Sequence, residues 1–93
     1  MEIEIFTNVL KDILGGGNKI EIPEGDSINL KKLFEFLARN YGRELLERLF
    51  DGENLRPEII LRVNETAVDS QKCMDIEVQS GDRIVIQTAM AGG

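Results

Sequence analysis

The chain has 93 residues, of which 42% are hydrophobic, and 17 acidic against 11 basic residues give it a net charge of −6. This length suits one domain with a modest core, and the composition is that of a globular protein rather than a disordered one. The acidic balance disfavours nucleic-acid binding, which needs a cationic surface, and suits a basic patch on a protein partner. No apolar run approaches the ~20 residues of a membrane span, and the charged start does not fit a signal peptide, so we expect a cytoplasmic protein that binds no membrane.

The first third predicts a strand, a short helix and a second strand. Residues 1–6 alternate apolar and acidic side chains, which indicates a strand with one buried face. Apolar residues at helical spacing then predict a helical turn that ends at Gly15-Gly16-Gly17, namely Val9, Leu10, Ile13 and Leu14. Glycines that follow a helix are in the wrong order for phosphate binding, so we interpret them as a flexible turn into a strand at residues 19–22.

The clearest helix of the sequence begins after Asn29, its predicted N-cap, with Ser27 as the alternative cap. Apolar residues at i, i+3, i+4, i+7, i+8 and i+11 form one stripe that we expect to pack on a sheet: Leu30, Leu33, Phe34, Leu37, Ala38 and Tyr41. Gly42 ends this helix. A second helical stretch is predicted over residues 43–50, followed by a turn or loop at 51–54.

The last third predicts strands at residues 59–63, 74–78 and 83–88, with a short arm at 66–68 after a turn at Asn64-Glu65. The run Ile84-Val85-Ile86 is apolar at successive positions, which suits a central strand covered on both faces. A hairpin, then a helix, then further strands predict an α+β fold in which a sheet packs on one main helix.

The sequence contains no histidine and one cysteine, Cys73. Histidine is the commonest general base and metal ligand, so its absence argues against an autonomous enzyme and against a metal site. We interpret Cys73 as a small half-buried structural residue rather than a reactive thiol. The chain ends in Gly92-Gly93 behind Ala89-Met90-Ala91, a pattern typical of a mobile tail, although many chain ends are simply frayed.

Several segments in the right order resemble the small subunit of molybdopterin synthase, the MoaD family of sulfur carriers within the ubiquitin-like β-grasp (MoaD/ThiS) proteins. Residues 6–15 resemble that family's first strand and short helix, and residues 61–68 resemble its valine-asparagine hairpin. Residues 80–86 match the Gly-Asp step into its last strand, and residues 90–93 match its tail. Two positions depart from the family: Glu65 stands where glycine is usual, which puts an Asn-Gly type of turn in question, and Gln87-Thr88 stand where prolines commonly precede the tail.

The resemblance implies a β-grasp domain over residues 1–88, with an extra short helical segment, and a flexible tail over residues 89–93. It implies that Gly93 is adenylated by a ubiquitin-activating-type enzyme (MoeB/ThiF-like) and converted to a thiocarboxylate, with no cofactor or metal bound to the chain. Gly92, Ala91, Met90 and Ala89 would enter the partner's channel. The other partner would be a MoaE-like large subunit, in a heterotetramer that transfers sulfur to a pterin precursor.

Three other functions remain open. The chain could carry sulfur to thiamine or tRNA, although thiamine carriers are typically shorter and lack so much helical insert. It could be a ubiquitin-like modifier joined through Gly93 to lysines of other proteins, because the same adenylated tail serves both chemistries. It could also be a plain protein-interaction domain with an incidental Gly-Gly end.

Overall fold

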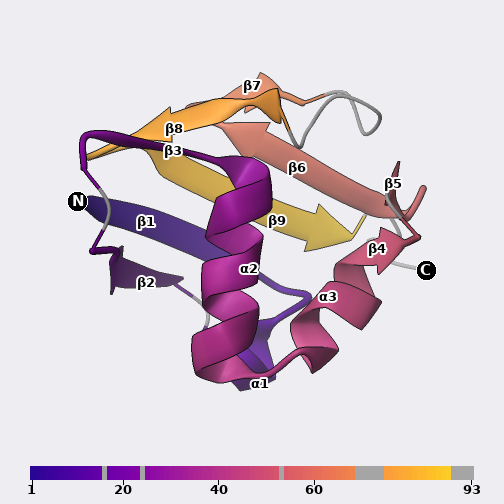
Figure 1. The fold of residues 1–93 in the computed structure, drawn as a ribbon. Helices are drawn as coiled ribbons and strands as arrows, with labels where there is room; N and C mark the ends of the chain where they lie inside the picture. The colour runs from indigo at the N-terminus through magenta and orange to yellow at the C-terminus, as the bar shows by residue number, and fades with distance from the viewer. Residues whose placement is uncertain (16, 24, 53, 69–74, 89–93) are drawn as a thin grey trace.

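The computed structural model describes residues 1–15, 17–23, 25–52, 54–68 and 75–88. Its main element is a five-stranded mixed sheet of order β2-β1-β9-β6-β7. The strands are β1 (Glu2–Thr7), β2 (Gly17–Glu21), β6 (Ile59–Val63), β7 (Thr66–Ala67) and β9 (Arg83–Thr88). β1 and β9 pair in parallel, and the other pairs of this sheet are antiparallel. The predicted α+β fold with a sheet on one main helix is confirmed (Figure 1).

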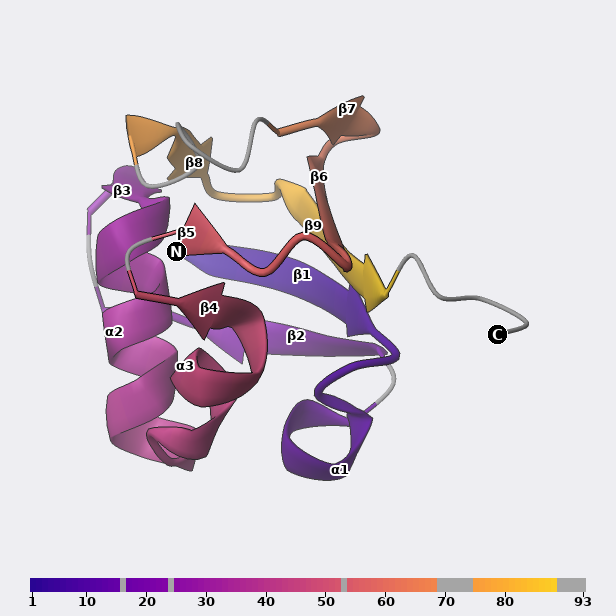
Figure 2. The ribbon, with the colours of Figure 1, turned by 90° about the vertical axis from the view of Figure 1, so that its right-hand side faces the viewer.

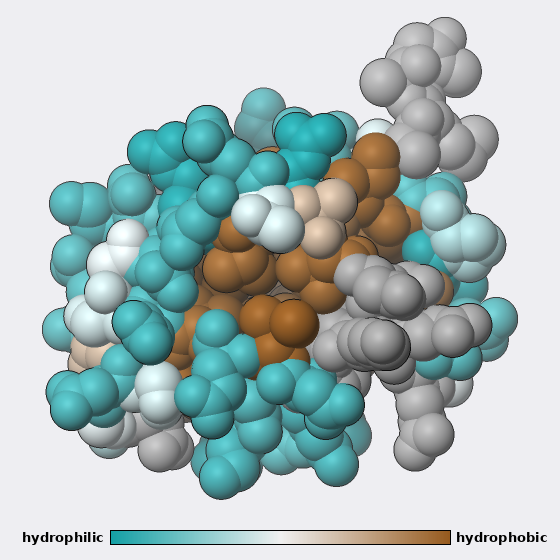
Figure 3. All heavy atoms as spheres, turned by 90° about the horizontal axis from the view of Figure 1, so that it is seen from above, coloured by the Kyte–Doolittle hydropathy of each residue, from teal (hydrophilic) through white to brown (hydrophobic). Residues whose placement is uncertain are grey.

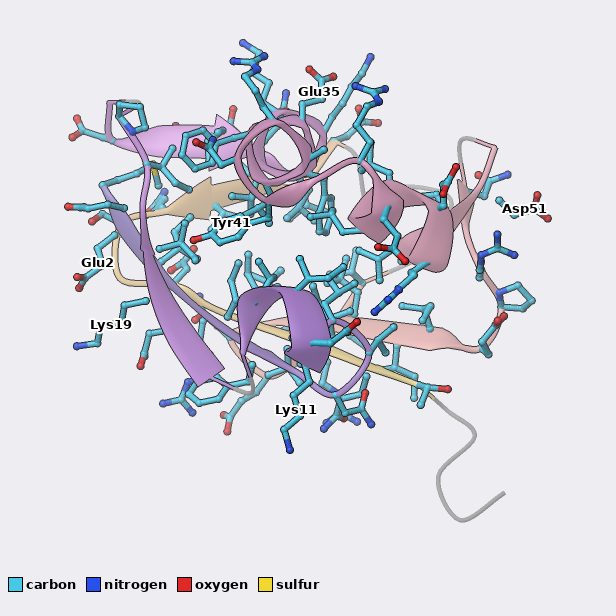
Figure 4. The ribbon with its side chains drawn as sticks, turned by 90° about the horizontal axis from the view of Figure 1, so that it is seen from below. Glu2, Lys11, Lys19, Glu35, Tyr41 and Asp51 are labelled. Carbon is cyan, nitrogen blue, oxygen red and sulfur yellow. The ribbon has the colours of Figure 1, made fainter. Side chains whose placement is uncertain are left out.

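The helices cover one face of the sheet (Figure 2). The main helix α2 (Leu30–Tyr41) is followed by α3 (Glu44–Leu49), and α1 (Lys11–Leu14) closes the lower end of the fold, with Lys11 pointing away from the interior (Figure 4). α2 begins at its predicted cap, where the Asn29 side chain accepts a 2.9 Å hydrogen bond from the Lys32 amide. The capped amide is one of those that the first helical turn cannot satisfy itself, so this cap defines the start of the helix.

The core lies between the sheet and α2. Five of the six predicted stripe residues of α2 are buried, and the exception is Tyr41, which is 41% exposed. Tyr41 is the last residue of α2, and in the view from below its side chain lies between α2 and the β2 side of the molecule, at the lower end that faces solvent (Figure 4). The prediction that Tyr41 belongs to the buried stripe is therefore wrong. In the view from above, apolar residues are visible at the centre of the molecule, between hydrophilic residues on the side of the sheet and hydrophilic residues on the side of the helices (Figure 3).

Several short elements differ from the prediction. Gly17 belongs to β2 rather than to the turn before it, and the predicted loop at 51–54 carries a small hairpin of β4 (Phe50–Asp51) and β5 (Asn54–Leu55). Of the strand expected at 74–78, residue 74 lies outside the described residues, and the observed strand β8 (Glu77–Gln79) begins and ends later than expected. It pairs with β3 (Ser27–Asn29), directly before α2. A three-residue strand of this kind forms because another strand pairs with it, and its own residues do not predict that pairing.

The β6–β7 hairpin turns through Asn64 and Glu65, whose φ angles are +51° and +73°. Positive φ at both central residues is what a type I′ hairpin turn requires. The turn therefore keeps this conformation although Glu65 has the Cβ atom that disfavours it.

Candidate functional site

The five predicted site residues, Ala89 to Gly93, lie outside the described residues, as does Cys73. The structure describes the strand that precedes them. β9 is the third of five strands, flanked by β1 on one side and β6 on the other. The prediction of a central strand is confirmed, while coverage on both faces is wrong: Ile84 and Ile86 are buried, but Val85 on the other face is only half-buried.

The two neighbours of β9 stop at nearly the same level. The β1 ladder ends at the pair Thr7–Ile86, and the β6 ladder ends at the pair Ile59–Thr88. Beyond Thr7, the Asn8 amide still donates to the Ile86 carbonyl at 3.3 Å, and the Asn8 side-chain oxygen Oδ1 accepts from the Thr88 amide at 3.2 Å. Asn8 is thus hydrogen-bonded to Ile86 and to Thr88 near the end of β9, directly before the predicted tail.

Thr7 bends the chain away from β9 and into α1. Its side chain is only 5% exposed, and its Oγ1 accepts hydrogen bonds from the amides of Val9 and Leu10, each at 3.1 Å. Threonine side chains commonly bond to nearby backbone in this way. Sequence reasoning assigned no role to Thr7 or Asn8, although a Thr-Asn pair at the end of a strand is itself a signal for such a turn.

A second support of this turn comes from α3. Arg48 Nη1 donates to the Val9 carbonyl at 3.3 Å, and the same guanidinium forms an ion pair with Asp12 of α1, in which Nη2 and Oδ2 are 2.8 Å apart. The hydrogen bond from Arg48 holds the pKa of the Asp12 carboxyl below its usual range. This ion pair joins α1 to α3 and stabilises the turn. The lowered pKa of Asp12 therefore reflects a structural ion pair and does not indicate a catalytic group.

The sheet face opposite the helices is open and partly apolar. The alternation of β1, β6 and β9 places Phe6, Ile60 and Val85 on it, with Phe6 37% exposed. Register puts Phe6 beside Val85, and Val85 beside Arg62. The Arg83 guanidinium lies 5.2 Å from the centre of the Phe6 ring. An apolar surface bordered by Arg62 and Arg83 therefore lies along β9, and Arg83 also forms an ion pair with Glu4 of β1, with Nε and Oε1 3.8 Å apart.

A groove of about 1100 Å³ lies on the helix layer, and none of the residues that line it comes from β9. Its floor is apolar (Phe34, Ala38, Leu46, Phe50), and its rim mixes basic residues with acidic ones (Lys31, Arg39, Arg43, Glu35, Glu47, Asp75). Such a rim selects neither sign of ligand charge. In the described ranges there is no group of three or more potential metal ligands, and no helix there has both the length and the apolar composition needed to cross a membrane.

Known structures resemble this fold over nearly the whole chain. A crystal structure of the Amycolatopsis orientalis BexX/CysO complex matches with a TM-score of 0.76 and 24% identity, covering 98% of this chain and 99% of that chain. The small archaeal modifier protein 1 of H. volcanii matches with a TM-score of 0.69 and 17% identity (94% and 95% covered). A candidate molybdopterin converting factor, subunit 1, from Pyrococcus furiosus matches with a TM-score of 0.65 and 20% identity (95% and 97% covered). At these identities the likeness shows the shared β-grasp fold.

No curated protein sequence matches the chain significantly. The model of the ThiS family, in contrast, matches residues 3–93. Proteins of this family form a thiocarboxylate at their C-terminal residue and are substrates of enzymes rather than catalysts. This chain therefore belongs to the ThiS family, the small sulfur carriers and ubiquitin-like modifiers built on the β-grasp fold.

Proposed function

We propose that this chain is a sulfur carrier that acts as the small subunit of molybdopterin synthase, in the biosynthesis of the molybdenum or tungsten cofactor. The observation that carries the proposal is the family match over residues 3–93, which includes the Gly-Gly end. The place of β9 supports it, because the strand that leads into residues 89–93 is held on both sides by the sheet. In this proposal residues 1–88 are the body and residues 89–93 are the working tail, which spans up to roughly 17 Å when extended.

The chemistry takes place at the Gly93 carboxylate. A carboxylate oxygen attacks the α-phosphorus of ATP, pyrophosphate leaves, and an acyl-adenylate forms. A hydrosulfide then attacks the acyl carbon, AMP leaves with the C–O bond electrons, and a thiocarboxylate remains. Its sulfur is a soft nucleophile that attacks an electrophilic carbon of the pterin precursor, where a C–S bond forms as a C–O bond to an oxygen leaving group breaks. Water then hydrolyses the resulting thioester, which returns the Gly93 carboxylate and leaves a thiol on the pterin. Glycine suits this position because it has no side chain to crowd the carbonyl carbon, and Gly92 lets the backbone pass through a narrow channel.

Two protein partners follow from this chemistry: a MoeB/ThiF-like adenylating enzyme and a MoaE-like large subunit that holds the pterin, both in the cytoplasm. We propose that both bind the open sheet face beside β9, where Phe6, Ile60 and Val85 are bordered by Arg62 and Arg83. Partners with an apolar patch and an acidic rim would complement this face.

The pterin acceptor is a separate part of this proposal. The P. furiosus structure carries the name of a molybdopterin converting factor, and this name favours a pterin as the acceptor. The acceptor therefore needs an experiment of its own.

The first experiment measures the intact mass of the protein after incubation with ATP, magnesium, sulfide and the adenylating enzyme of the same genome. We expect a gain equal to the exchange of one oxygen for one sulfur, located at Gly93 by fragmentation. A variant that lacks Gly93 is the matched control and should gain nothing. An unchanged mass, with the adenylating enzyme active on another carrier, would contradict the carrier role and favour a plain interaction domain.

The second experiment identifies the acceptor. The thiocarboxylated protein is mixed with the candidate large subunit and pterin precursor, and the products are analysed by mass spectrometry. A sulfur-containing pterin together with desulfurated carrier supports the proposal. Sulfur found in tRNA or in a thiamine precursor instead, or an isopeptide bond from Gly93 to lysines of other proteins, would refute the pterin role.

A further inference from the structure

We propose that Asn8 is a positioning residue that holds Thr88 at the end of β9 and so sets the direction in which residues 89–93 leave the sheet. The functional part of this inference rests on the proposed role of these residues as a working tail. The structural part rests on contacts between described residues alone.

The first step concerns the hydrogen bonds between β1 and β9. In a parallel pair, one residue donates its amide to a carbonyl of the neighbouring strand and accepts, through its own carbonyl, from the amide two residues further on. Asn8 makes the first of these bonds with its backbone, to the Ile86 carbonyl at 3.3 Å. It makes the second with its side chain, because Oδ1 accepts from the Thr88 amide at 3.2 Å. The side-chain oxygen of Asn8 therefore replaces a main-chain carbonyl and extends the ladder after the β1 backbone has turned away.

The second step concerns the other side of β9. The Asn64 amide donates to the Arg83 carbonyl, so the pair Val63–Ile84 is of the type that exchanges no hydrogen bond. Because antiparallel pairs alternate, Ile59–Thr88, four residues along, is of the same type. The Thr88 amide thus points away from β6 and toward the β1 side, where Asn8 lies.

The third step concerns the rigidity of the Asn8 turn. Thr7 Oγ1 accepts hydrogen bonds from the amides of Val9 and Leu10, and Arg48 of α3 donates a hydrogen bond to the Val9 carbonyl. Arg48 is itself held by Asp12 and by Glu44. The backbone of Asn8 is therefore fixed by groups on both sides, so its side chain needs little further ordering to hold Thr88.

The consequence concerns how the tail meets an adenylating enzyme. The bond from the Thr88 amide to Asn8 helps to fix Thr88, the last described residue before the tail, and therefore the point and direction from which residues 89–93 start. Removing the Asn8 oxygen lets the last residues of β9 fray, so fewer conformations of the free chain can enter the enzyme. We expect the KM for adenylation to rise about fivefold, the size of one net hydrogen bond, while kcat is unchanged.

The experiment compares Asn8→Ala with Asn8→Asp, which keeps an acceptor oxygen at the same position. The matched control is Asn40→Ala, since Asn40 is also an exposed asparagine with one side-chain hydrogen bond to backbone, to Phe36 on α2. The readouts are the hydrogen-exchange rate of the Thr88 amide, the order parameters of residues 89–93 by NMR, urea unfolding, and pyrophosphate-exchange kinetics with the adenylating enzyme.

We expect faster Thr88 exchange, lower order at residue 89 and a raised KM in Asn8→Ala only, with Asn8→Asp restoring all three. Unchanged Thr88 exchange or unchanged order at residue 89 in Asn8→Ala would overturn the inference. A raised KM that appears equally in Asn40→Ala, or that merely follows a lower urea midpoint, would overturn it as well. If the wild-type protein is not adenylated at all, the proposed function fails, and the two NMR readouts still decide the role of Asn8.

Discussion

The hydroxyl of Thr7 offers a quantitative test of how the turn below the sheet is held. Thr7→Val replaces this hydroxyl by a methyl group of similar volume, so the substitution opens no cavity. It removes the acceptor of two amides, of which that of Leu10 is buried and that of Val9 is partly buried. A buried amide that loses its acceptor costs about 1–3 kcal/mol, and the Val9 amide, which water can partly reach, costs less.

We therefore expect the free energy of unfolding to fall by about 2 kcal/mol in Thr7→Val. A domain of this size shifts its Tm by about 4–8 °C per kcal/mol, so the Tm should fall by roughly 10 °C. Urea unfolding followed by circular dichroism measures the change, and hydrogen exchange at Leu10 locates it.

Thr7→Ser is the matched control, because it keeps the acceptor oxygen and loses only a methyl group, at a cost of about 1 kcal/mol. Leu10 exchange should accelerate in the valine variant and not in the serine variant. If Thr7→Val were as stable as the wild type, or more stable than Thr7→Ser, methyl packing rather than the hydroxyl would hold this turn and our reasoning would be refuted.

Three other substitutions test separate parts of the structure. Glu65→Gly should raise the free energy of unfolding by about 0.5 kcal/mol, because glycine adopts a positive φ without strain, while the greater freedom of its unfolded chain offsets part of the gain. Glu65→Ala keeps the strain, so an equal gain for this variant in urea unfolding would contradict this account. Asp12→Asn should lower the free energy of unfolding at pH 7, because it removes the ion pair with Arg48. Since Arg48 lowers the pKa of Asp12 in the folded protein, this loss of stability should be complete above the ordinary pKa of about 3.9 and should disappear as the pH falls through the pKa of Asp12 in the folded protein. A deficit in the urea midpoint that is as large at about pH 2 as at neutral pH would refute the role of the carboxylate. Phe6→Ser should weaken binding of the adenylating enzyme about tenfold in calorimetry, whereas Tyr41→Ser, the other exposed aromatic residue, should not; equal losses in both would refute binding at the open sheet face.

Elements with a strong period of their own could be predicted from the sequence. β1 alternates, α2 carries a stripe and a cap, and β9 has the apolar run of a central strand; the structure contains all three. In these segments local preference and burial agree, so the pattern alone is sufficient.

Elements that depend on a distant partner could not be predicted. β3 is a strand only because β8 pairs with it, about 50 residues later in the chain. Tyr41 fits the periodicity of α2, but periodicity does not tell where the covering elements end, and Tyr41, the last residue of α2, is left exposed at the lower end of the molecule. The contact of Asn8 with Thr88 joins residues 80 positions apart, so no local pattern could have indicated it.

The central place of β9 also has a mechanical consequence. An enzyme that grips residues 89–93 would pull along the axis of β9, which pairs with β1 on one edge and β6 on the other. Such a force loads the hydrogen bonds of both ladders together, in shear, instead of opening them one after another. A tail attached to an edge strand would have only one ladder to resist the load. The domain can thus resist unfolding when a partner protein pulls on its C-terminus.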